Sequence, residues 1–163
     1  MKKNEISIEY IKKLLRNEAI ENYIDILNSS TLDLQDKEGR SILFHAVLQN
    51  NEYLVKELLK KGAEINVQDN YGWTLLHYAA QEYQPSIVKL LIEHGANVNL
   101  VDKNGNSPLC RAVFDSKGQG AIINLLLASG ADPYLENNYN ISPIKLARSI
   151  SNYDVKIFFK DYK

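Results

Sequence analysis

The sequence predicts an all-α fold, a solenoid in which helix-turn-helix units with β-turn fingers stack one on the next. Three observations support this prediction. A turn of the form Asp-x-x-Gly recurs every 33 residues, at Asp36, Asp69 and Asp102. Two apolar segments follow each turn, a short one with small side chains and a longer one with helical spacing. A Gly-Ala pair follows the second segment. Because one such unit cannot cover its own apolar faces, neighbouring units must stack.

The first helix of each unit is expected directly after its turn. A hydroxyl residue stands two positions beyond the turn glycine, as Ser41, Thr74 or Ser107. Such a side chain can cap free amide groups at a helix N-terminus. Pro108 fits a first helical turn, where its missing N–H costs nothing. The alanines of these short helices permit close neighbours: Ala46, Ala79, Ala80 and Ala112.

The second helix of each unit is predicted by the spacing of its apolar residues. In the first two units these residues are Leu54, Val55, Leu58 and Leu59, and then Ile87, Val88, Leu90 and Leu91. A glycine that can adopt the left-handed C-cap conformation follows each helix, as Gly62, Gly95 or Gly130. Each unit is therefore a pair of helices with a turn before each one.

These signals divide a single domain, residues 1–163, into five units. Two amphipathic capping helices are expected in residues 1–35, and full repeats in 36–68, 69–101 and 102–136. The third repeat carries a two-residue insertion within Ser116 to Gly120. Residues 137–163 form a C-terminal cap, with Asn140 in place of the turn glycine. Its second helix is expected to present Lys156, Lys160 and Lys163 to water. The opening methionine and the two modified ends favour a complete protein.

The second repeat carries a specific pattern. Its residues are Thr74, Leu75, Leu76, His77, Ala79, Ala80, Val88, Leu90, Leu91, Gly95, Ala96 and Asn99. With this pattern recurring, the chain from about residue 22 to its end resembles the ankyrin repeat family. Phe44 and Cys110 replace the family's histidine, and Asn50 and Tyr83 replace the glycine between the helices. The resemblance implies a concave face of fingers and first helices, and a binding module without catalytic activity or cofactor.

The composition excludes several classes of function. A net charge of -1 gives no general attraction to nucleic acid or to an anionic membrane. The single cysteine, Cys110, permits neither an internal disulfide nor a zinc site built on paired cysteines. The N-terminal segment lacks an apolar core of the length that a signal peptide needs, and no apolar run approaches membrane-spanning length. These features predict a cytoplasmic protein that is monomeric when free, and the bias towards Lys, Asn, Ile and Tyr suggests a bacterial source.

The side chains that could act in catalysis or bind a metal are better explained by structural roles. His77 matches the family position whose imidazole bonds to turn backbone, and no two histidines share a metal-ligand spacing. Cys110 is expected as a small buried hydrophobe, the alternative being a reactive thiol. Glu82 and Asp115 are expected on a solvated face, the alternative being an acid/base pair. No catalytic, metal-binding or small-molecule site is therefore predicted.

The predicted partner-binding residues lie on the fingers and at the exposed ends of the first helices. They are Glu38, Arg40, Tyr71, Trp73, Gln81, Glu82, Tyr83, Lys103, Asn106, Phe114, Asp115 and Tyr139. Tyrosine and tryptophan dominate interface hot spots, and Trp73 is placed at the middle of this surface. Two alternatives remain open. In the first, the aromatic residues do not bind a partner but pack on their neighbours and stiffen the fingers, and Lys37, Arg40 and Lys103 form a solvated rim. The insertion either contacts the partner or is neutral loop drift.

The function expected from these features is one-to-one binding of another protein through the concave face. Its most concrete form is a bacterial immunity protein that covers the active site of a cognate toxin. The alternative is a scaffold, or a secreted effector that engages a host or cellular protein. An enzyme with an unrecognised site and a nucleic-acid-binding protein are disfavoured.

Overall fold

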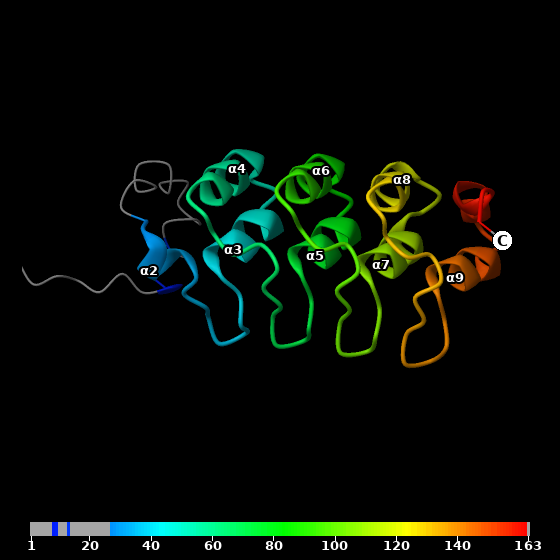
Figure 1. The fold of residues 1–163 in the computed structure, drawn as a ribbon, viewed down its shortest axis with the longest axis horizontal. Helices are drawn as coiled ribbons and strands as arrows, with labels where there is room; N and C mark the ends of the chain where they lie inside the picture. The colour runs from blue at the N-terminus through cyan, green and yellow to red at the C-terminus, as the bar shows by residue number, and fades with distance from the viewer. Residues whose placement is uncertain (1–7, 10–12, 14–26, 163) are drawn as a thin grey trace, which may run out of the picture.

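Two layers of helices and a row of fingers make up the computed structural model, which describes residues 8–9, 13 and 27–162 (Figure 1). The inner layer contains α3 (Ile42–Leu48), α5 (Leu75–Gln81), α7 (Pro108–Asp115) and α9 (Pro143–Ser149). The outer layer contains α4 (Glu52–Lys60), α6 (Pro85–Glu93) and α8 (Ala121–Ala128). The short helix α2 (Ser29–Leu32) precedes these layers, and the 3-10 helix η3 (Val155–Phe159) follows them. Each helix from α3 to α7 contacts its partner in the same repeat and its counterpart in the next, which confirms the all-α solenoid.

The fingers, residues 36–40, 69–73, 102–106 and 137–141, share one hydrogen-bond pattern. In the second finger, the Asp69 N–H donates to the Trp73 carbonyl and the Gly72 N–H donates to the Asp69 carbonyl. Asp69 Oδ1 also accepts from the Tyr71 and Trp73 N–H groups, at 2.8 and 3.0 Å. Asp or Asn side chains that bond to the backbone two residues on are typical of tight turns. The recurring aspartate, replaced by Asn137 in the last finger, therefore sets the shape of each finger.

Adjacent fingers are joined through their backbones. The Lys103 N–H donates to the Tyr71 carbonyl over 3.1 Å. The backbone approach is so close that a Cβ atom added at Gly72 would lie 2.8 Å from the Lys103 nitrogen. Gly72 also has a φ of +79°, which favours glycine. The fingers therefore form a connected row rather than independent loops.

The residues that replace glycine adopt a left-handed backbone conformation. Asn50 and Tyr83, between the two helices of their repeats, have φ values of 53° and 48°. Asn140, in the last finger, has a φ of 58°. A positive φ is uncommon for residues other than glycine and is tolerated best by Asn and Asp. The substitutions therefore retain the geometry of the repeat.

The core lies between the two helix layers. Leu43, Leu76 and Leu109 of the inner layer are almost fully buried. The outer helices bury the predicted apolar residues Leu54, Val55, Leu58, Leu59, Ile87, Val88 and Leu91, while Leu90 is only half-buried. The core therefore runs along the whole stack, as expected when each unit covers the next.

The C-terminal cap differs from the prediction in its second element. The expected α-helix is instead η3, in which Val155 and Phe159 are buried. The 3-10 form suits a segment of this length, because runs of 3-10 helix are short. Lys156 and Lys160 are exposed, as predicted, whereas Lys163 and nearly all of the expected N-terminal helices lie outside the described residues.

The insertion of the third repeat packs on this cap. A Cβ atom added at Gly118 would lie 3.1 Å from the Tyr153 ring, and one at Gly120 would lie 2.1 Å from the Phe158 ring. The loop therefore contacts the end of the solenoid. None of the helices described here is long and apolar enough to cross a membrane.

Candidate binding face

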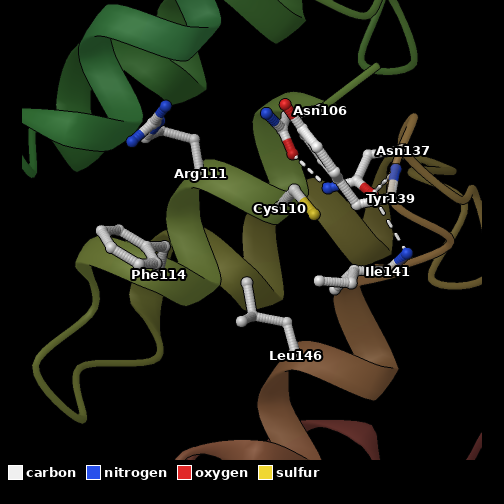
Figure 2. A pocket seen from close by; sticks show the side chains of 8 residues that line it. All are labelled: Asn106, Cys110, Arg111, Phe114, Asn137, Tyr139, Ile141 and Leu146. Atoms are coloured by element: carbon white, nitrogen blue, oxygen red, sulfur yellow. Dashed lines mark hydrogen bonds between the residues drawn. The ribbon is translucent and has the colours of Figure 1, made fainter. Parts of the chain in front are cut away.

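The side of the molecule formed by the fingers and the inner helices, the predicted concave side, is called the inner face here. Described residues line three hollows on it. The tryptophan hollow, about 420 Å³, is lined by Arg40, Tyr71, Trp73, Tyr78, Gln81, Lys103 and Asn104. The acidic hollow, about 290 Å³, is lined by Gln81, Glu82, Tyr83, Asp115, Lys117 and Gln119. The phenylalanine hollow, about 340 Å³, is lined by Asn106, Cys110, Arg111, Phe114, Asn137, Tyr139, Ile141 and Leu146 (Figure 2).

Trp73 is half-buried in the wall of the tryptophan hollow. Its ring centroid lies 4.8 Å from that of Tyr78. The Arg111 guanidinium carbon lies 4.5 Å from the same tryptophan ring, a distance typical of a cation–π contact. The expectation that Trp73 is exposed is therefore met only in part, because Trp73 also packs on its neighbours. Tyr71, in contrast, is 62% exposed.

Arg40 belongs to a hydrogen-bonded network rather than to a solvated rim. The Tyr78 hydroxyl donates to Asp69 Oδ2 over 2.6 Å. Arg40 Nη2 donates to the Tyr78 oxygen over 2.6 Å, and Arg40 Nε donates to Asp69 Oδ2 over 3.4 Å. Burial, helped by Asp69, raises the pKa of Tyr78 to about 12, so its hydroxyl keeps its proton. This network ties the first two fingers to α5.

The walls of the phenylalanine hollow come from α7, α9 and the third and last fingers, as Figure 2 shows. Phe114 is 65% exposed, Tyr139 68% and Ile141 40%. Leu146, from α9, is half-buried against the core. Three of the large exposed apolar side chains of the described residues thus surround one hollow. Grouped exposed apolar surface is a sign of a binding site.

The amide groups of the phenylalanine hollow are bound to their neighbours. Asn137 Nδ2 donates to Asn106 Oδ1 over 2.7 Å, and Asn106 Nδ2 donates to Asp102 Oδ2 over 3.3 Å. Asn137 Oδ1 accepts from the Tyr139 and Ile141 N–H groups. These side chains hold the two fingers together. The hollow therefore offers mainly apolar surface to a ligand.

Asp115 differs from the fully solvated carboxylate that the sequence predicted. Asp115 is half-buried, and its Oδ2 lies 3.6 Å from Arg111 Nη1. Burial raises the pKa of Asp115, and the nearby Glu82 adds to that rise, while Arg111 opposes it. Glu82 itself is exposed, as predicted. The two carboxylates face one hollow together with Lys117.

The hollow-lining residues that the sequence-based prediction missed include three that share one position in the repeat: Tyr78, Arg111 and Leu146. Each stands four positions after the capping residue of its helix, which is Thr74, Ser107 or Ser142. Each lines a hollow between a finger and its neighbour. This shared position in the repeat is the signal that could have identified them.

The predicted binding residues are largely brought together. Those that line one of the three hollows are Arg40, Tyr71, Trp73, Gln81, Glu82, Tyr83, Lys103, Asn106, Phe114, Asp115 and Tyr139. Glu38 lies apart from the hollows, with its carboxylate 3.6 Å from Lys37 Nζ. The Glu38 carbonyl accepts a hydrogen bond from the Asn70 N–H. Glu38 is therefore part of the link between the first two fingers.

The structural role predicted for His77 is confirmed. His77 Nδ1 accepts from the Thr74 N–H at 3.1 Å, and Nε2 donates to the Asn106 carbonyl at 2.9 Å. Burial lowers the pKa of His77, which keeps the ring neutral. Cys110 is buried as expected, and burial raises the pKa of its thiol to about 11, so the unreactive thiol form prevails. The described residues contain no cluster of side chains suited to a metal ion.

Comparison with known families agrees with this architecture. The model described as ankyrin repeats (3 copies) matches residues 3–102 and 43–137. These two segments overlap and together span most of the chain. A comparison with curated proteins finds no match. The repeating fingers and paired helices, together with this match, show that the chain belongs to the ankyrin repeat family.

Proposed function

We propose that this protein binds a partner protein through its inner face. Ankyrin repeats are generally protein–protein interaction modules. The observation that favours the inner face is the set of exposed aromatic side chains around its hollows. Tyr71, Phe114 and Tyr139 are each more than 60% exposed, and they come from three successive repeat units. Aromatic side chains of this kind supply large contact area at low entropic cost.

The rigidity of the fingers supports the same proposal. Each finger is held by its Asp or Asn side chain, and neighbouring fingers are joined by backbone hydrogen bonds. Tyr71 and Tyr139 are therefore carried on backbone that is already ordered. A preorganised surface loses less conformational entropy on association than a flexible loop does.

The narrower form of the proposal takes the partner to be a toxin. The protein binds the toxin one to one and covers its active site, so that it acts as an immunity protein. A rigid face with several hollows suits a folded partner surface. Co-expression with the product of a neighbouring toxin-like gene tests this form, and restored growth is the expected result. Growth that stays arrested would favour the scaffold or effector role.

Affinity measurements with matched variants test the general proposal. The partner is first isolated by pull-down and identified by mass spectrometry. Tyr71→Ala and Phe114→Ala are each expected to weaken binding by about tenfold or more, because exposed aromatic residues at hollows act as hot spots. Tyr53→Ala is the control, since Tyr53 is 52% exposed on the outer helix α4. Binding lost with Tyr53→Ala but kept in both inner-face variants, all of them folded, would overturn the proposal.

A further inference from the structure

The charged side chains of the inner face are divided between its hollows. The tryptophan hollow is lined by two cations, Arg40 and Lys103, and the phenylalanine hollow by one, Arg111. Among the described residues, no carboxylate lines either of these two hollows. The carboxylates Glu82 and Asp115 instead line the acidic hollow. The finger side of the inner face therefore carries cations beside aromatic rings.

Lys103 is the cation of this set that remains available. Arg40 is bonded to Asp69 and Tyr78, and Arg111 lies beside Asp115. Lys103 is exposed, and no carboxylate of the described residues lies within ion-pair distance of its ammonium group. A partner carboxylate can therefore reach Lys103 without displacing an existing ion pair.

The tryptophan and phenylalanine hollows are neighbours. The Arg111 guanidinium carbon lies 4.5 Å from the Trp73 ring centroid and 5.8 Å from that of Phe114. One finger also contributes to both hollows, with Lys103 at one and Asn106 at the other. A short stretch of a partner chain can therefore contact both hollows at once.

The phenylalanine hollow has the character of an apolar anchor site. Its exposed walls are Phe114, Tyr139 and Ile141, and the amides of Asn106 and Asn137 are already bonded. A polar group that enters the hollow would give up its water and meet amide groups that are already bonded to each other, which costs free energy. Its volume of about 340 Å³ is at the small end of ligand sites. An apolar side chain is the group that gains most from this hollow.

We infer that the two hollows recognise a segment of the partner protein in which a large apolar side chain stands close to acidic residues. The apolar side chain, aromatic or branched aliphatic, fills the phenylalanine hollow, and a carboxylate pairs with Lys103. This inference rests on the proposed function and names the chemistry of its partner. The apolar anchor supplies most of the affinity, while the exposed ion pair contributes orientation and specificity.

A displayed library of random short peptides, selected on the full chain, tests this inference. The expected enrichment is for aromatic, leucine or isoleucine residues beside Asp or Glu. Binding of an enriched peptide is then followed by the fluorescence of Trp73, the only tryptophan, which lines the hollow beside Lys103. Affinity should fall as salt is added, because the carboxylate contact is exposed to solvent.

Two pairs of variants separate the anchor from the charge. Phe114→Ala and Lys103→Glu should each lower the affinity for the enriched peptide by about tenfold. Their controls are Tyr53→Ala and Lys56→Glu on the outer helix α4, which should change its affinity by less than about twofold. All four side chains are exposed, and circular dichroism verifies that each variant folds.

Several outcomes would overturn the inference. These are no enrichment, enrichment of basic peptides, or an affinity that Lys103→Glu leaves unchanged. The proposed function fails separately, when the natural partner binds Tyr71→Ala and Phe114→Ala as tightly as the parent chain. A natural partner that needs those residues, but is not displaced by acidic-apolar peptides, would refute the inference and leave the proposed function standing.

Discussion

Among single residues, His77 links its own helix to the finger of the next repeat. It is fully buried, caps its own helix through Thr74 and donates to the carbonyl of Asn106 in the next finger. His77→Ala removes both bonds and leaves a cavity, so it should lower the free energy of unfolding by roughly 2–4 kcal/mol. Urea denaturation measures this change. The control His94→Ala alters an exposed residue and should cost much less.

The same residue predicts a dependence of stability on pH. Burial is the main cause that lowers the pKa of His77, and Arg111 adds to it, while the Asn106 hydrogen bond, Asp102 and Asp69 oppose it. Because the folded pKa lies below the ordinary value of 6.5, the contribution of His77 is complete above that value. It is lost as the pH falls from there towards the folded pKa. His77→Ala should therefore lose less stability than the parent chain on acidification, and an equal loss in both would contradict this account.

The residues of the binding face show what the sequence alone could predict. The role of His77 followed from its place in the repeat pattern, because its partners belong to the same pattern. The packing of Trp73 did not, since it depends on Arg111 in the next repeat. Arg40 likewise is fixed by Asp69 and Tyr78 of its neighbour. Contacts that cross between repeats depend on the residue identities at both ends, which a repeat pattern does not specify.

At the scale of elements, the fingers depend on close approach between neighbours. Gly72→Ala would place a Cβ atom 2.8 Å from the backbone nitrogen of Lys103, in addition to the cost of a φ of +79°. The expected loss of stability is roughly 2–4 kcal/mol. Gly62→Ala is the matched control, because Gly62 has a φ of +85° with open space around it. Thermal unfolding should show a larger loss for Gly72→Ala, and equal losses would mean that the finger contact adds nothing.

The elements also differ in how far the sequence predicted them. The paired helices recur with a fixed spacing and appear where expected. The positive φ values at Asn50, Tyr83 and Asn140 are a finding of the structure. The element η3 was mistaken for an α-helix because its apolar spacing suits either form. The packing of the insertion on Tyr153 and Phe158 had no sequence signal. The repeating sequence pattern therefore predicts the paired helices, whereas the structure of the insertion and of η3 depends on packing contacts that the pattern does not specify.

For the whole molecule, the stacked architecture makes stability local, because the described helices make their main contacts within their own unit and with the adjacent units. Val155 and Val55 test this property from opposite ends, since both are 0% exposed. Val155→Ala should speed hydrogen exchange in α9 and η3 and leave α3 and α4 unchanged. Val55→Ala should do the reverse. Exchange that rises along the whole chain in either variant would show instead that the stack opens as one unit.

This locality bears on binding, because the phenylalanine hollow lies between the third repeat and the cap. Tyr139, Ile141 and Leu146 belong to the last unit that the structure describes, which packs on the third repeat through α9 and α7. If that unit unfolds locally, the side chains that line the phenylalanine hollow move apart, whereas the tryptophan hollow keeps its shape. Val155→Ala should therefore lower the affinity for an acidic-apolar peptide more than Val55→Ala does, although neither valine lines a hollow. An equal effect of the two variants on the Trp73 fluorescence titration would place the anchor elsewhere on the inner face.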